Sequence, residues 1–227
     1  MAKVYLIPSL LHEEGMQAIP AYILETVKSC QEFFVENERT ARRFLKKLSK
    51  EIVIDDYGWH TIKDDADTVE AFRQAVKAGK TIGILSEAGC PGVADPGQKL
   101  VAIAQSLDAE IHPLTGPNSI LLALMASGLN GQQFQFRGYL PIENPQRIKA
   151  IKELEAAAIY ATQIFIETPY RNNQLVEAIV KNCKPGTLLC IAVDLTGPQE
   201  WVKTKAIKDW QHNLPDIHKR PAIFLLG

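Results

Sequence analysis

The chain has 227 residues, of which 46% are hydrophobic and 22% charged, and its formal net charge is −1. This composition is typical of a folded globular protein and excludes an intrinsically disordered one. Because the net charge is close to zero, no global field steers the protein to nucleic acid, and any nucleic-acid site must rest on a local patch. The length allows one large domain or two modest ones.

The length of the apolar stretches and the spacing of the histidines and cysteines predict the compartment and the metal content. No stretch approaches the roughly 18 consecutive apolar residues of a membrane span, and the first residues indicate a strand rather than a signal peptide. The five histidines lack metal-ligand spacing, and the cysteines form no disulfide framework. The cysteines are Cys30, Cys90, Cys183 and Cys190. We therefore expect a cytoplasmic protein without a membrane span or a metal.

In the first half, strand-length apolar runs alternate with helical patterns. Strands are predicted at residues 4–7, 33–35, 81–86 and 111–114. One helix is expected to begin at a capping Asp67 and to end at Gly79, and another to begin at Asp95 with Pro96 in its first position. Alternating strands and helices predict a mainly parallel sheet with helices on both faces.

The second half has a different pattern. A helix is predicted at residues 118–127, stopped by Gly128, and one main helix begins at residue 144 among several strands. Those strands are expected at residues 133–139, 163–167, 187–193, 200–204 and 222–226. Closely spaced strands favour a mixed sheet. The sequence thus predicts an α/β protein of two α/β domains, residues 1–113 and 114–227.

Three loops that follow strands stand out. Residues 86–97 and 114–119 carry glycine, proline and polar residues, and residues 167–171 carry an acid and an arginine. In open α/β sheets, ligands bind outside the carboxyl ends of the strands, and glycine lets backbone approach a ligand closely. A purely structural turn is an equally good interpretation of the first of these loops. Neither the dinucleotide-binding glycine fingerprint nor a phosphate-binding loop with lysine is present.

The loops also carry recognisable motifs. Residues 86–91 are Ser-Glu-Ala-Gly-Cys-Pro, residues 115–119 Thr-Gly-Pro-Asn-Ser, residues 138–141 Gly-Tyr-Leu-Pro and residues 167–171 Glu-Thr-Pro-Tyr-Arg. In this order and spacing the chain resembles the tetrapyrrole methylase superfamily of S-adenosylmethionine-dependent methyltransferases. Within it, the chain is most similar to the branch of bacterial 16S rRNA cytidine 2′-O-methyltransferases. Weaker matches occur at residues 36–39 and 193–196.

The departures from this branch concern the substrate. The branch has a Gly-Asn pair after its first strand, where residues 9–14 here are Ser-Leu-Leu-His-Glu-Glu, and Glu87 replaces an aspartate. Ile142 and Glu143 replace a basic pair. Three functions therefore remain open: methylation of a ribose in small-subunit rRNA, methylation of a tetrapyrrole or other small molecule, and non-catalytic binding of S-adenosylmethionine.

The resemblance implies a cofactor cleft between the two domains and a set of residues that line it. Those residues are Pro8, Leu10, Glu87, Ala88, Gly89, Cys90, Asn118, Ser119, Ile166, Ala192 and Ala222. Plain core packing explains Ala192 and Ala222 equally well. The resemblance also implies a homodimer.

Three charged residues match family positions and are catalytic candidates. A ribose hydroxyl loses its proton during methyl transfer, so a nearby base would help, and Glu36 or Glu167 could serve. Arg39 could hold a phosphate. A surface ion pair is an equally good interpretation of each. His60 also matches a family histidine, although a solvated loop histidine is the favoured interpretation.

The chain also has a local basic patch. Residues 39–50 are predicted to form a helix whose six cations lie within an arc of about 140°. They are Arg39, Arg42, Arg43, Lys46, Lys47 and Lys50. Such clustering suits phosphate binding, so we expect Arg42, Arg43, Lys46 and Lys47, together with Arg171, to contact the RNA backbone of rRNA or the small ribosomal subunit. A solvated basic face is the alternative.

Overall fold

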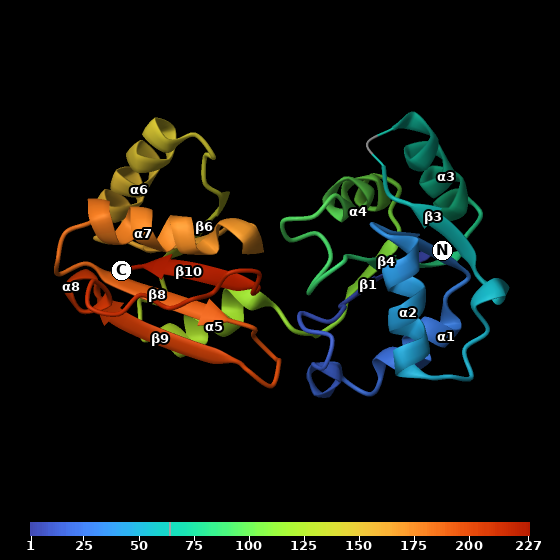
Figure 1. Cartoon of the computed structure of the whole chain (residues 1–227). Helices are drawn as coiled ribbons and strands as arrows, with labels where there is room; N and C mark the ends of the chain where they lie inside the picture. The colour runs from blue at the N-terminus through green and yellow to red at the C-terminus, as the bar shows by residue number, and fades with distance from the viewer. Residues whose placement is uncertain (64) are drawn as a thin grey trace. The chain divides into compact units, whose positions relative to one another are not determined.

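The computed structural model describes residues 1–63 and 65–227. Two compact units, Met1–Asn118 and Ser119–Gly227, make up the chain. Each unit has its own five-stranded sheet and its own hydrophobic core (Figure 1). The predicted two α/β domains are therefore confirmed as a fold class, while the functional boundary after residue 113 stays a prediction.

The first unit is built on a parallel sheet. Its strand order is β3-β2-β4-β1-β5, and all four strand pairs are parallel, as predicted. The strands are β1 (Lys3–Ile7), β2 (Glu32–Val35), β3 (Gly58–Thr61), β4 (Thr81–Leu85) and β5 (Glu110–Pro113). In a parallel sheet the carboxyl ends of all strands lie at one edge, so the loops after β1, β2, β4 and β5 gather there.

Helices cover both faces of this sheet because successive strand residues point to opposite faces. The helices are α1 (Ile23–Ser29), α2 (Glu38–Leu48), α3 (Ala66–Lys77) and α4 (Gly97–Ser106). Phe33 packs in a cluster with residues of α1 and α2, whereas Phe34 packs with residues of α3 and α4. The unit is thus a helix–sheet–helix sandwich that fixes the strand-end loops.

Several local predictions in the first unit are wrong. Asp65, not Asp67, caps α3, because its carboxylate accepts the backbone N–H of Thr68 at 2.8 Å. Pro96 lies just before α4 rather than in its first turn. Lys50 lies beyond the end of α2, because the chain becomes extended at Ser49. The sequence analysis also missed α1 and β3, which are short and lack a clear hydrophobic period.

The second unit contains the predicted mixed sheet. Its order is β6-β7-β10-β8-β9, with β6 parallel to β7 and the other pairs antiparallel. The strands are β6 (Phe134–Tyr139), β7 (Thr162–Ile166), β8 (Leu188–Val193), β9 (Trp201–Ala206) and β10 (Ala222–Leu226). The antiparallel β10 brings the start of one strand beside the ends of two others.

Four helices complete the second unit: α5 (Ser119–Ser127), α6 (Asn144–Ala158), α7 (Asn172–Asn182) and α8 (Ile207–Trp210). Figure 1 shows α6 and α7 on one face of the sheet and α5 on the other. The expectation of one main helix among the strands is wrong, because α7 is a second long helix, buried through Leu175 and Ile179.

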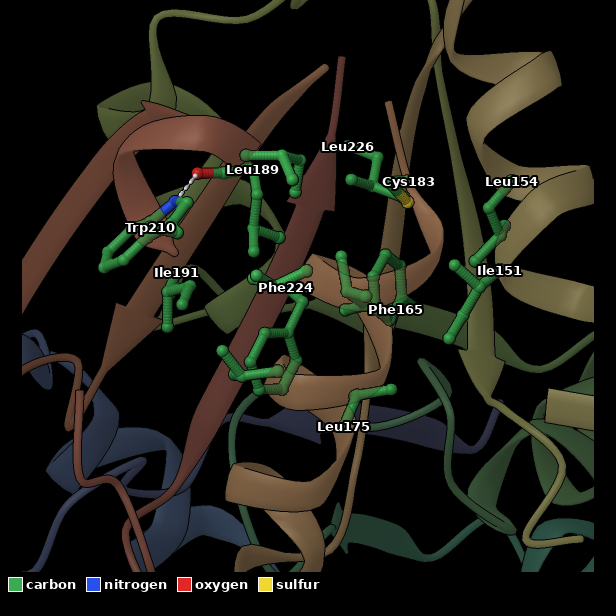
Figure 2. Close-up of a cluster of buried hydrophobic side chains, with 14 of the residues drawn as sticks. Ile151, Leu154, Phe165, Leu175, Cys183, Leu189, Ile191, Trp210, Phe224 and Leu226 are labelled. Atoms are coloured by element: carbon green, nitrogen blue, oxygen red, sulfur yellow. Dashed lines mark hydrogen bonds between the residues drawn. The ribbon is translucent and has the colours of Figure 1, made fainter. Parts of the chain in front are cut away.

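The core of the second unit is aromatic and aliphatic. Phe165 of β7 and Phe224 of β10 stack with ring centroids 5.8 Å apart (Figure 2). Trp210 is buried beside them, and its indole N–H donates to the carbonyl oxygen of Leu189 at 2.9 Å. A buried tryptophan needs such an acceptor, so this bond ties α8 to β8. Among the described residues, no helix is both long enough and apolar enough to cross a membrane.

Candidate functional site

The loops after β1 and β4 are joined in the first unit. Ser9 donates its backbone N–H to the carbonyl oxygen of Gly89 at 2.9 Å, and Gly89 donates back to Ser9 at 3.3 Å. The Ser9 hydroxyl also donates to the Ser86 carbonyl oxygen at 2.9 Å. These bonds are buried or nearly so, and therefore hold the segment that departs from the family pattern firmly against the glycine-rich loop.

The loop after β5 joins the same assembly. A Cβ atom added at Gly116 would lie 2.1 Å from the Pro8 side chain, so only glycine permits this contact. Gly89 has φ of +76°, and a Cβ there would lie 3.2 Å from both Leu11 and the Pro117 carbonyl oxygen. The Cys90 thiol lies 3.5 Å from the same oxygen. Predicted cofactor residues Pro8, Gly89 and Cys90 are therefore brought together.

Asp95 closes the glycine-rich loop onto α4. Its Oδ1 accepts the backbone N–H groups of Gly92 at 2.9 Å and Gly97 at 2.8 Å. Burial raises the pKa of this carboxyl group, against the lowering effect of the two hydrogen bonds. The expectation that Asp95 stands at the cap position is wrong, because Pro96 occupies it, but the Asp95 carboxylate still accepts the Gly97 amide that opens the helix.

Two glutamates meet where β2 and β4 end. Glu36 accepts the backbone N–H of Glu87 at 3.0 Å, and Glu87 in turn accepts the Thr40 hydroxyl at 3.4 Å. Burial raises the pKa of Glu36, and the charges of Asp95 and Glu87 raise it further, while the Glu87 amide opposes them. A carboxylate with a raised pKa at a strand end is a candidate general base.

The basic helix α2 begins beside this pair. Asn37 caps it by accepting the backbone N–H groups of Arg39 at 3.0 Å and Thr40 at 3.3 Å. Ala41 and Phe44 are buried beneath it. The cap fixes the start of the helix, and the buried face leaves the cations on the opposite side of α2.

The structure separates these cations into two groups. Arg42 pairs with Glu38 and lies 5.2 Å from the centre of the Trp59 ring, and Lys46 donates to the carbonyl oxygens of Lys50 at 3.1 Å and Ile52 at 2.5 Å. Both therefore support the local fold. Arg43 and Lys47 are exposed and line a cavity beside the loop after β1.

In the second unit, Glu167 and Arg171 form a local ion pair. The Glu167 side chain is fully buried and accepts two N–H groups of Arg171, at 3.0 and 2.6 Å, and its own neighbour's amide at 2.7 Å. The pair links the end of β7 to η3 (Pro169–Arg171). Its geometry is that of a structural element, which favours Glu36 over Glu167 as a proton acceptor.

The three predicted cofactor residues on the second sheet lie at one end of it. Ile223 is paired with both Ile166 and Ala192, and Ala222 precedes it. Close by, Asp194 has φ of +50° and accepts a hydrogen bond from Arg220 at 2.7 Å. A non-glycine residue in this conformation is strained and is often found at functional sites.

Sequence reasoning missed Ser9, Thr40 and the Asp194–Arg220 pair. Ser9 lies just after β1, and Thr40 lies in the first turn of α2. Ligands of open α/β sheets bind at the carboxyl ends of the strands, so these positions could have marked both residues as candidates. Arg220 carried none, because the partner of Asp194 is 26 residues away in the chain.

His60 is also placed differently from the expectation. It lies on β3 rather than in a loop, stacks on Phe34 with ring centroids 4.4 Å apart, and contacts Glu32, which is also paired with Lys80. Within residues 1–63 and 65–227, histidine, cysteine and acidic side chains form no group of three that could hold a metal ion.

Comparison with known proteins identifies the family. The chain belongs to the tetrapyrrole (corrin/porphyrin) methylase family, whose model matches residues 16–209. The resemblance inferred from the motifs is thereby confirmed.

Two of the curated proteins to which the chain is similar carry the same name. The ribosomal RNA small subunit methyltransferase I of Mesorhizobium japonicum is 30% identical over 82% of this chain and 61% of its own length. The Bacillus subtilis protein of that name is 29% identical over 80% of this chain and 60% of its own. The chain therefore spans about three fifths of the length of these relatives.

Solved structures share the fold. The methyltransferase CobJ superposes with a TM-score of 0.63 at 17% identity, covering 100% of this chain and 94% of its own. Uroporphyrin-III C-methyltransferase from Thermus thermophilus, complexed with S-adenosylhomocysteine, gives 0.58 at 13% identity, with 100% and 97% covered. Diphthine synthase gives 0.69 at 12% identity, with 100% and 89% covered.

Proposed function

We propose that this protein is an S-adenosylmethionine-dependent methyltransferase that methylates the 2′-hydroxyl group of a ribose in small-subunit rRNA. Family membership and the names of the curated relatives support the proposal. The observation that carries it is Glu36, a carboxylate with a raised pKa beside a helix that presents exposed cations. A base next to a phosphate-binding surface suits a nucleic-acid hydroxyl as acceptor.

The cofactor part of the proposal uses the strand-end loops. When bound, S-adenosylmethionine supplies a methyl group that is already activated on a positively charged sulfur. The loop at residues 86–97 fits such a ligand because Gly92 has open space around it and Val93 is exposed. Pro8, Leu10, Glu87, Ala88, Gly89, Cys90 and Asn118 of the first unit, with Ser119, Ile166, Ala192 and Ala222 of the second, remain the proposed cofactor residues.

The proposed chemistry assigns one task to each charged residue. Glu36 would accept the proton of the ribose hydroxyl as the hydroxyl oxygen takes the methyl group, whose bond to the cofactor sulfur would break at the same time. The backbone amide of Glu87 holds the Glu36 carboxylate in place at 3.0 Å. Arg39, exposed in the first turn of α2, holds a phosphate. Glu167 is the less favoured candidate for the proton acceptor, because its carboxylate already accepts two N–H groups of Arg171.

Assembly and location complete the proposal. A homodimer is implied by the resemblance, and light scattering should give about twice the chain mass of 25.2 kDa. A mass near that of one chain would contradict it. Cytoplasmic location and a metal-free reaction remain predictions of the sequence.

One experiment tests the function directly. Cofactor labelled in its methyl group is incubated with the protein and, separately, with small ribosomal subunits, deproteinised rRNA and tetrapyrrole precursors. We expect label in rRNA, on a ribose. Label in a tetrapyrrole would favour the small-molecule function instead. Binding of S-adenosylhomocysteine without any transfer would favour a non-catalytic protein.

A further inference from the structure

Strand β9 lies at one edge of the second sheet, where it pairs with β8 (Figure 1). Leu188 of β8 exchanges two backbone hydrogen bonds with Gly227, of 3.0 and 3.1 Å, so its backbone groups face the side of β10. Successive residues of an antiparallel strand direct their backbone groups to alternate sides. Leu189, which lies opposite Lys205, therefore directs its groups to β9, and the same alternation runs along both strands.

The outer edge of β9 carries unpaired backbone groups. By this alternation, Trp201, Lys203 and Lys205 direct their N–H and C=O groups to β8. Val202 and Thr204 direct theirs away from the sheet, and among the described residues no group bonds to them. The two residues are about 6.8 Å apart along the strand, which is the repeat at which another extended backbone offers acceptors and donors in return.

One face of β9 lines a cavity of about 420 Å³. Its walls combine tryptophans, lysines and polar residues: Trp201, Lys203, Lys205, Trp210, Asn213 and Asp216. The three β9 residues are two positions apart, so their side chains share this face. A strand added to the outer edge would place alternate side chains beside them.

The β9 side of this cavity is positively charged. Lys203 is exposed and makes no ion pair within the described residues, and the Lys205 ammonium lies 4.8 Å from the centre of the Trp210 ring. The carboxylate of Asp216 on the other wall already accepts the side-chain N–H of Asn173 at 2.8 Å. Two cations therefore face any strand that adds to β9.

The charge and the backbone together disfavour two occupants. Pairing with β9 of a second copy would set lysines opposite lysines, and opposed like charges destabilise a strand pair. Lysines on an edge strand guard against such self-pairing. RNA phosphates would be attracted by Lys203, but they would also meet the outward C=O groups of Val202 and Thr204, whose oxygens carry negative partial charge. An extended acidic peptide satisfies both the lysines and the backbone groups.

We propose that the outer edge of β9 is a docking site for an extended segment of a partner protein whose alternate residues are acidic. The segment adds antiparallel to β9, the slightly more stable arrangement, and exchanges backbone hydrogen bonds with Val202 and Thr204. Its acidic side chains face Lys203 and Lys205. Backbone pairing supplies affinity, and charge supplies selectivity. The site belongs to the second sheet alone and does not depend on methyl transfer.

The test titrates the isotope-labelled full chain with a capped seven-residue peptide that alternates valine and glutamate and has valine at both ends. In NMR spectra the backbone amide signals of Val202 and Thr204 should shift most, because these groups gain acceptors. A peptide with lysine in place of glutamate should bind at least about threefold more weakly. Methylation of the valine amides, which face β9, should abolish binding, whereas methylation of the glutamate amides, which face solvent, should preserve it.

Two variants test the protein side. Val202→Pro removes an outward N–H but no bond to β8, so an edge strand tolerates it and the melting temperature should stay near that of the parent. It should weaken peptide binding about tenfold or more. Lys203→Glu should weaken the glutamate peptide and strengthen the lysine peptide. Lys77→Glu, at an exposed position on α3 in the first unit, should change neither.

Four results would overturn the proposal. They are the absence of shifts at Val202 and Thr204 at millimolar peptide, equal affinity for the glutamate and lysine peptides, and undiminished binding of the peptide methylated on its valines. The fourth is binding of a uridine oligonucleotide in place of the peptide, unchanged by Val202→Pro, which would assign the lysines to RNA. Methyl transfer is a separate measurement, so failure of this site and failure of the proposed function are distinguishable.

Discussion

Ser9 and Gly89 exchange two backbone hydrogen bonds, of 2.9 and 3.3 Å, across the loops that follow β1 and β4. Gly89 can make this pair because it adopts a positive φ that most residues avoid. The pair joins the segment that differs from the family pattern to the loop that matches it.

Replacing Gly89 tests whether this junction orders the loop that we propose to bind the cofactor. Gly89→Val should lower the free energy of unfolding by about 1–3 kcal/mol through backbone strain, and crowding against Leu11 and Pro117 should also abolish S-adenosylhomocysteine binding. Calorimetry and thermal melting measure the two effects. Gly79→Val, at the end of α3, is the matched control, because Gly79 has a φ of +72° but no neighbour within 4 Å of an added Cβ. Equal loss of binding in both variants would show that strain alone, and not crowding at Gly89, is responsible.

Glu36 should show its role in the pH dependence of methyl transfer. Only the ionised carboxylate accepts a proton, so activity of the parent should rise as pH increases through the raised pKa of Glu36. Glu36→Gln should lower the rate about 10²–10⁴-fold and remove this rise. Glu25→Gln, a change at an exposed position on α1, should keep the parent profile.

Stability separates this effect from misfolding. Because the folded-state pKa of Glu36 is raised, its stabilising contribution is complete at low pH and is lost as pH rises through that pKa. Glu36→Gln should therefore be at least as stable as the parent at neutral pH. A clear loss of stability there, in thermal melting, would mean that Glu36 is structural.

The two groups of cations on α2 should behave differently when reversed in charge. Arg43→Glu with Lys47→Glu should weaken RNA binding and reduce the slope of log affinity against log salt by about 1.4, at roughly 0.7 per phosphate contact on single-stranded RNA. Arg42→Glu with Lys46→Glu should instead lower the melting temperature, because these side chains hold Glu38 and the carbonyl oxygen of Ile52. Filter binding over a salt series measures the first effect. Identical salt slopes for both double variants would contradict the division.

Glu32 should contribute stability that depends on pH. Burial would raise its pKa, but the hydrogen bonds and charges of Lys80 and His60 lower it overall. A lowered pKa gives stability that is present above the unfolded value of about 4.3 and is lost as pH falls through the folded value. Glu32→Gln should cost about 1–3 kcal/mol at neutral pH, and the difference should vanish in acid.

A matched control exists for this carboxylate. Glu25 pairs with Lys28 at 3.2 Å, but its side chain is 75% exposed, against 12% for Glu32. Glu25→Gln should change urea unfolding little at any pH, since exposed ion pairs contribute little. A comparable loss for both variants would show that burial is not what makes the Glu32 cluster matter.

Local sequence chemistry determined much of the fold. The apolar run at residues 81–86 predicted a buried strand, which is β4. Gly79 and Gly128 follow their helices because each adopts a positive φ after the last turn. The alternation of strands and helices gave a parallel first sheet, and the crowded strands of the second half gave a mixed one. These features depend on residues close together in the chain.

Tertiary structure decided the rest, because it depends on partners that are far apart. Arg42 and Arg43 are adjacent and alike in sequence, yet one contacts Trp59 and the other lines a cavity. Glu36 and Glu167 both follow strands, but Arg171 engages one while the Glu87 amide and burial set the pKa of the other. Helical spacing places side chains on a face, whereas only packing of the chain decides which of them meet a partner and which remain available to a ligand.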